Sequence, residues 1–112
     1  MQFEQVKQRM DRIEESADQA KQACQKGSPP SELRECVARL HEQASATKHA
    51  MQGQESASEE SVRRDVMQLE DTADRAMQAC RNAGNVDPQL QQAVQRTHAE
   101  VSSLKKEMMQ AA

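Results

Sequence analysis

Apolar side chains recur along the start of the chain in alternating steps of three and four residues. In this first segment they are Phe3, Val6, Met10, Ile13, Ala17, Ala20 and Cys24. Steps of three and four keep side chains on one face of an α-helix, as in the a and d positions of a coiled coil. The pattern therefore predicts a helix with a single buried stripe.

Three further segments show the same spacing. The second contains Leu33, Val37, Leu40, Ala44, Thr47 and Met51. The third contains Val62, Val66, Leu69, Ala73, Ala76 and Cys80. The fourth contains Leu90, Val94, Thr97, Val101, Leu104 and Met108. We therefore expect four helices, each with one apolar stripe.

Polar stretches with helix-breaking residues separate the four segments: QKGSPPSE, GQESASEES and NAGNVDPQ. Glycine commonly ends helices, proline suits the first helical turn, and serine and aspartate cap helix N-termini. The residues expected at helix boundaries are Gly27 after the first helix, Pro29 and Pro30 in the first turn of the second, Ser56 or Ser58 before the third, and Asp87 and Pro88 at the start of the fourth.

The four segments form a repeated pair. Segment one matches segment three at an offset of 56 residues, so that ADQAKQAC at 17–24 returns as ADRAMQAC at 73–80. Segment two matches segment four at an offset of 57. Polar residues outside the stripes match as well, namely Glu14 with Glu70, Asp18 with Asp74, His41 with His98, and Lys48 with Lys105. This indicates internal duplication, with repeats 3–51 and 59–108 joined by a polar linker, 52–58.

Four amphipathic helices with short turns predict an all-α fold. We expect residues 1–112 to form a single domain, an antiparallel up-down-up-down four-helix bundle built from two tandem helical hairpins. An alternative keeps each hairpin whole but pairs hairpins between two chains through the linker, as a swapped dimer. The chain has one aromatic residue, and Ala, Gln, Glu, Lys, Arg and Met are common, which disfavours a sheet.

Charge and hydropathy exclude several classes of function. The net charge is −3, and residues 52–81 hold four basic and seven acidic side chains. No segment carries the concentrated positive charge that nucleic-acid binding requires. No apolar run suits a membrane span or a signal peptide. We therefore expect no nucleic-acid or membrane partner. The three cysteines are an odd number, which disfavours a disulfide framework, so we expect a cytoplasmic protein with reduced thiols.

The repeated octet has a packing interpretation and a chemical one. Its alanines lie on the stripe and allow neighbouring helices to approach closely near the turns, and cysteine behaves there as a small apolar residue. As a second interpretation, Cys24, Cys36 and Cys80 gather at the turn end and bind a thiophilic metal or sense redox state. Against this, Cys36 matches Ala93 in the other repeat, no CxxC occurs, and closed zinc sites use four ligands.

His41 and His98 each follow a stripe position by one residue. They are expected either to face each other across the bundle or to point into solvent. A metal site with a carboxylate such as Glu42 or Glu100 is a further alternative. The histidines cannot share a site with Cys24, because they lie about 10 Å deeper in the bundle at 1.5 Å per residue.

Other chemistry finds little support in the sequence. The adjacent acids Glu14-Glu15 and Glu70-Asp71 are expected to be solvated helix faces. No glycine-rich phosphate loop or haem-attachment motif occurs, and few residues suit a substrate pocket. We therefore expect no enzyme activity and no cofactor.

Met67 and Met77 lie one residue away from the third stripe, and Lys21 takes the place of Met77 in the first repeat. Methionine surfaces adapt to protein partners. The sequence therefore favours a non-catalytic protein–protein interaction or regulatory module that contacts its partner through Met67 and Met77, and a homodimer is one form of this. The alternative function is thiol-based metal binding or redox sensing.

Overall fold

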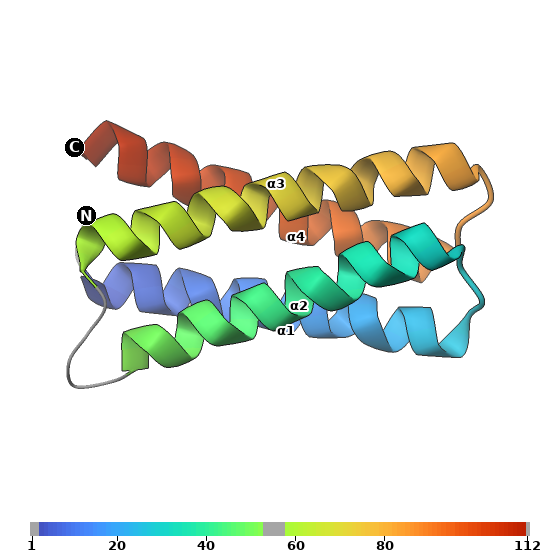
Figure 1. Ribbon diagram of the computed structural model, residues 1–112, viewed down its shortest axis with the longest axis horizontal. Helices are drawn as coiled ribbons and strands as arrows, with labels where there is room; N and C mark the ends of the chain where they lie inside the picture. The colour runs from blue at the N-terminus through green and yellow to red at the C-terminus, as the bar shows by residue number, and fades with distance from the viewer. Residues whose placement is uncertain (1–2, 53–57, 112) are drawn as a thin grey trace.

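The computed structural model describes residues 3–52 and 58–111, without the side chains of residues 3, 52, 59 and 111. The expectations for the Phe3 side chain and for Ser56 lie outside this part. The described residues form four helices and no strand: α1 (Phe3–Lys26), α2 (Ser31–Gln52), α3 (Glu59–Ala83) and α4 (Pro88–Ala111). They run alternately in opposite directions along a body of 41 × 25 × 17 Å (Figure 1).

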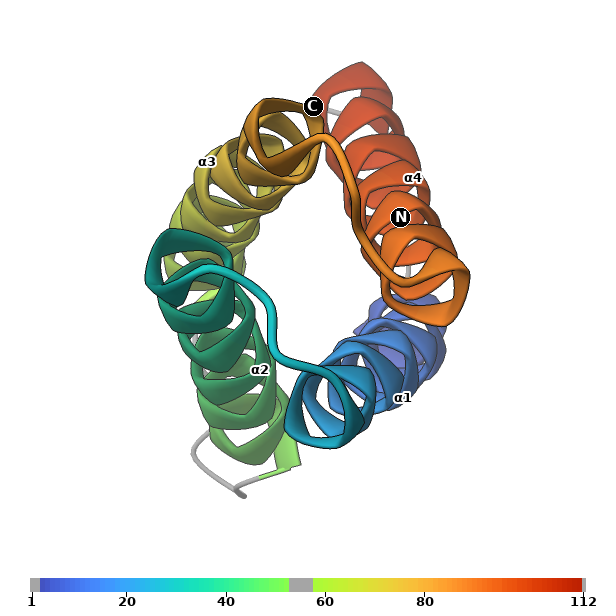
Figure 2. The same ribbon diagram turned by 90° about the vertical axis from the view of Figure 1, so that its right-hand side faces the viewer.

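The helices occupy the corners of a four-sided ring in chain order (Figure 2). Each helix contacts the two that adjoin it in this ring, and α1 closes it against α4. The α1–α2 and α3–α4 turns lie together at one end, the turn end, and both chain termini lie at the other (Figure 1). The expected all-α, up-down-up-down bundle is therefore confirmed.

Two helix N-termini are capped by side chains as the sequence indicates. Ser58 has extended backbone angles before α3, and its Oγ accepts a hydrogen bond from the Ser61 amide at 3.1 Å. Asp87 Oδ1 accepts a hydrogen bond from the Gln89 amide at 2.9 Å before α4, which begins at Pro88. These bonds satisfy amides that have no partner within the helix.

The start of α2 differs slightly from the expectation. This helix begins at Ser31, so Pro29 and Pro30 both lie before its first turn, and the Pro30 carbonyl accepts a hydrogen bond from the Arg34 amide at 3.1 Å. Gly27 ends α1 as expected, its amide donating to the Ala23 carbonyl at 3.1 Å. Gly84 ends α3 with a φ of 75°, a left-handed conformation that glycine adopts without strain.

The four stripes form the core. Every described side chain at the stripe positions is buried, including the polar Thr47 and Thr97. The four alanines of the repeated octets, Ala17, Ala20, Ala73 and Ala76, have no exposed surface. This burial is what the packing interpretation of the octet predicts.

Small and large residues are distributed unevenly along the core. Towards the turn end, a cluster combines alanine and cysteine from α1 and α3 with Leu33, Val37, Leu90 and Val94 from α2 and α4. The other cluster contains the larger α1 and α3 side chains Met10, Ile13, Val66 and Leu69. Near the turns, small residues on two helices therefore face branched residues on the other two.

Candidate functional site

The three cysteines lie in or against the core cluster at the turn end. Cys24 and Cys80 are buried, whereas Cys36 is half-buried and packs against the cluster from α2. All three are free thiols. Burial raises the pKa of each thiol above its ordinary value, and the neighbouring Cys80 raises the pKa of Cys24 further. These thiols are therefore protonated at neutral pH, whereas metal binding and redox chemistry need the thiolate.

The cysteines come together as a group without forming a metal cage. Within residues 3–52 and 58–111, no three His, Cys, Asp or Glu side chains are arranged to hold a metal ion. Glu100 Oε2 is buried without a hydrogen-bond partner, and Glu42 is exposed.

The two methionines singled out from the sequence lie in different environments. Met67 is 42% exposed on the outer face of α3. Met77 is half-buried and packs against the core cluster at the turn end. Met67 is therefore accessible to a partner, whereas Met77 is only partly accessible because it also packs against the core.

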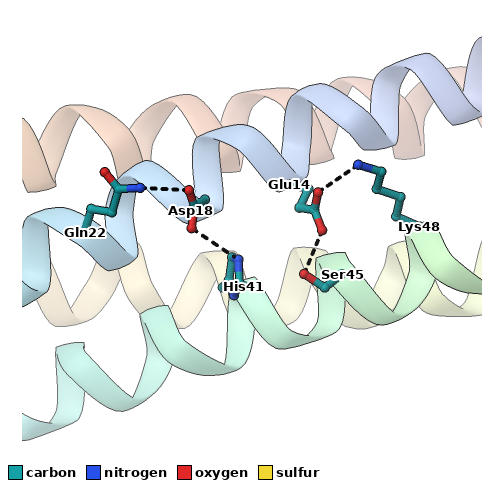
Figure 3. A network of polar contacts seen from close by, with 6 residues as sticks. All are labelled: Glu14, Asp18, Gln22, His41, Ser45 and Lys48. Carbon is teal, nitrogen blue, oxygen red and sulfur yellow. Dashed lines mark hydrogen bonds and ion pairs between the residues drawn. The ribbon is translucent and has the colours of Figure 1, made fainter.

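A polar network joins α1 to α2 beside the core (Figure 3). Glu14 accepts hydrogen bonds from Ser45 Oγ at 2.7 Å and from Lys48 Nζ at 2.9 Å. One turn away, Asp18 Oδ1 lies 3.5 Å from His41 Nε2. The hydrogen bond from Ser45, followed by that from Lys48, holds the pKa of Glu14 below its ordinary value.

The second hairpin repeats this network between α3 and α4. Lys105 Nζ lies 2.5 Å from Glu70 Oε1, and His98 Nε2 lies 2.5 Å from Asp74 Oδ1. The Lys105 hydrogen bond, with a smaller contribution from Ser102, lowers the pKa of Glu70. The glutamate, aspartate, histidine and lysine of the two networks match at the offsets of the duplication, whereas Asp11, which lies 3.4 Å from Lys48, corresponds to Met67.

Two sequence expectations need correction here. Glu14 and Glu70 are partly buried and hydrogen-bonded, so they are not simply solvated acids, whereas their neighbours Glu15 and Asp71 are exposed. His41 and His98 do not pair with each other, since each contacts an aspartate of its own hairpin. The sequence did carry a sign of these contacts, because the polar residues that make them recur outside the stripe at the offsets of the duplication.

A groove of about 260 Å³ lies between α1 and α4 near the turn end. Its polar lining consists of Gln19, Gln22 and Lys26 from α1 and Gln89, Gln92 and Arg96 from α4. Two alanines, Ala23 and Ala93, line it as well. The lining thus carries two positive charges and no negative charge.

A second groove, also about 260 Å³, lies between α2 and α3. It is lined by Glu32, Glu35, Cys36 and Arg39 from α2 and by Thr72, Arg75, Gln78 and Asn82 from α3. Because the duplication maps α1 onto α3 and α2 onto α4, the two grooves occupy equivalent positions. Two acidic residues balance two arginines in the second groove, which leaves no net charge.

Sequence reasoning did not single out the grooves. Glutamine, arginine and glutamate are common on helix surfaces, so their presence carries no periodic signal. Recognising a groove requires knowing how α1 lies against α4, two helices at opposite ends of the chain.

Comparisons with known proteins found no relative of this chain. No protein-family model matches the chain, and no match was found among curated proteins or solved structures. Among the described residues, no helix has the length and apolar character needed to cross a membrane.

Proposed function

We propose that this protein is a non-catalytic interaction module that binds a protein partner through its helix surfaces. The observation that carries the proposal is the contrast between what the two repeats share and where they differ. They share the buried stripes and the Glu–Lys and Asp–His pairs. They differ in the side chains of the two equivalent grooves.

Differences between copies of a duplication are informative when they fall outside the core. The shared residues maintain the fold, since they fill the interior or join the helices of a hairpin. The grooves can vary without disturbing this scaffold, and function commonly resides in such variable surfaces on a fixed fold. The change from Glu32 and Glu35 to Gln89 and Gln92 is of this kind.

Met67 supplies a further contact position. It replaces Asp11 of the first repeat and is exposed on α3, and methionine packs adaptably against partners. A single exposed methionine is ordinary for a protein surface. We therefore assign Met67 a supporting role, and a smaller one to Met77, which is half-buried against the core cluster at the turn end.

The proposal is tested by placing a photo-reactive amino acid at Gln22, Gln78 or Met67, one position per variant, in the organism's own cells. Gln22 and Gln78 line the two grooves at equivalent positions, and exposed Gln95 on α4 is the control. We expect one protein to be cross-linked from a test position and not from Gln95. Purified partner and chain must then bind each other directly, with an affinity that falls at least tenfold on substitution at that position.

Two outcomes decide against the interaction module or refine it. If no test position yields a specific adduct, or if the purified proteins do not bind, the proposal is wrong. If the cross-linked protein is a second copy of this chain, the chain is its own partner and forms a homodimer. Sedimentation equilibrium must then give twice the chain mass of 12.6 kDa.

Thiol-based metal binding or redox sensing is the second candidate. One observation favours it, since Cys24, Cys36 and Cys80 all adjoin one core cluster at the turn end. Their raised pKa values oppose it, so we rank it below the interaction module. Stoichiometric Zn(II) or Cu(I) binding that is lost on changing the three cysteines to alanine would reverse this order.

A further inference from the structure

The groove between α1 and α4 is a local region of positive charge on an acidic protein. Lys26 and Arg96 line it without any acidic residue, while the chain as a whole carries a net charge of −3. We propose that this groove binds a short acidic segment of the protein partner. This inference rests on the proposed function and specifies its site and its ligand chemistry.

The two cations provide the charge recognition. Arg96 is exposed, and its one hydrogen bond to Gln19 is long, at 3.5 Å, so the guanidinium is free to turn towards a carboxylate and bind it with two parallel hydrogen bonds. Lys26 is exposed on the opposite helix and adds a second positive charge. A segment lying between the two therefore meets a cation on each wall.

The glutamines suit a peptide backbone. Gln19 and Gln22 on α1, and Gln89 and Gln92 on α4, are each one helical turn apart, so both walls present amide groups in rows. A side-chain amide both donates and accepts hydrogen bonds, which matches the alternating groups of an extended peptide. Gln22 directs its nitrogen to Asp18 at 2.9 Å, and this leaves its oxygen as an acceptor.

The length of the groove sets the length of the segment. From Gln19 to Lys26 the helix rises about 10 Å at 1.5 Å per residue. An extended peptide advances about 3.3 Å per residue, so three or four residues span this distance. The Ala23 and Ala93 side chains at the groove are small, so the peptide can approach both helices closely.

The equivalent groove between α2 and α3 is a natural control. Arg39 corresponds to Arg96, but Glu32 and Glu35 replace the two α4 glutamines. These carboxylates repel an acidic peptide and compete with it for Arg39 and Arg75. We therefore expect the α1–α4 groove to bind one acidic segment per chain and the α2–α3 groove to bind none.

The test uses a fluorescein-labelled peptide with four consecutive glutamates between glycines. Its binding to the chain is measured by fluorescence anisotropy at low salt. We expect saturable binding that weakens as salt is added. The K26Q/R96Q variant should lose at least tenfold in affinity, and the matched variant R39Q should bind as the unmodified chain does. Circular dichroism must show that both variants retain their helices.

A gain of binding gives a second test. The E32Q/E35Q variant gives the α2–α3 groove the glutamines and the charge of its counterpart. We expect the number of peptides bound per chain, measured by titration calorimetry, to rise from one to two. If E32Q/E35Q still binds one peptide per chain, the positive charge and the glutamine amides of a groove do not define the peptide site.

Other results overturn this inference. These are no binding of the tetraglutamate peptide, an equal loss in R39Q, or displacement of the peptide by an equal concentration of inorganic phosphate. If the peptide fails but a purified partner still binds through Met67 or the α2–α3 groove, only this inference is wrong. If no partner binds either, the interaction module fails with it.

Discussion

The ammonium group of Lys48 lies 2.9 Å from the carboxylate of Glu14, across the interface of α1 and α2. The same pair recurs in the second hairpin as Lys105 and Glu70. Both carboxylates are partly buried, and Glu14 also accepts a hydrogen bond from Ser45. The duplication thus copied a helix-to-helix contact as well as an apolar stripe.

These pairs predict a specific loss of stability in acid. The pKa values of Glu14 and Glu70 are lowered from their ordinary value of 4.5, so the folded chain binds fewer protons than the unfolded chain in this range. The stabilisation is therefore complete above pH 4.5 and is lost as the pH falls through the lower folded values. Melting temperatures measured from pH 7 down to pH 3 should show this decline.

The double variant E14Q/E70Q provides the comparison. Glutamine keeps the shape of glutamate and can still accept a hydrogen bond, but it cannot titrate. Its melting temperature should be lower than that of the unmodified chain at pH 7 and should fall less between pH 5 and pH 3. Parallel curves for the two proteins would contradict the assignment. E15Q/D71N, which alters the exposed neighbours, should leave the decline unchanged.

The buried cysteines should act as packing residues. Cys24→Ala and Cys80→Ala each remove a buried sulfur and should lower the free energy of unfolding by about 1–2 kcal/mol. Cys36→Ala, at a half-buried position, should cost less than about 1 kcal/mol. Urea unfolding measures all three. An equal cost at the three positions would contradict the burial order.

The two glycines at the turn end should respond differently to alanine. Gly84 has a φ of 75°, and a Cβ there would meet no atom within 4 Å, so only backbone strain opposes the change. Gly84→Ala should cost about 1–2 kcal/mol. At Gly27, φ lies outside the left-handed region and the added Cβ would make an ordinary contact at 3.6 Å. Gly27→Ala should therefore be neutral or stabilise by about 0.4–1 kcal/mol.

Thermal unfolding of the two glycine variants distinguishes backbone strain at Gly84 from a general sensitivity of both turns to substitution. A destabilised Gly27→Ala variant together with an unaffected Gly84→Ala variant would reverse the expected order. It would then follow that the α1–α2 turn, rather than the α3–α4 turn, needs glycine.

The fold was predictable because its information is local and repeated. Stripes such as Val6 to Cys24 specify one face of one helix, and four such stripes leave few arrangements besides a bundle. The boundary at Pro30 was missed by one residue, since proline is accepted both just before and within the first turn.

The candidate site was less accessible to sequence reasoning. Glu14 and Lys48 lie on different helices, and their contact depends on how far α2 is shifted along α1. The matching of Glu14 with Glu70 was visible, but nothing local distinguished it from the exposed Glu15. Lys26 and Arg96 line one groove only because α4 closes the ring against α1.

We expect the alanine stripe to set how closely the helices approach near the turns, and this expectation can be tested by mutation. Ala76 is fully buried within the cluster that contains Val37 and Val94. Leucine at this position has no space, so Ala76→Leu should cost about 1–3 kcal/mol through overpacking. Ala38→Leu, on the exposed face of α2, adds the same atoms in solvent and should change stability by less than about 0.5 kcal/mol.

Chemical denaturation of both alanine variants, monitored by helical circular dichroism, gives the comparison. If Ala76→Leu is as stable as Ala38→Leu, the helices do not approach closely at this stripe. The small residues of the repeated octet would then need another explanation, and the cysteines that end each octet would regain their interest as chemical groups.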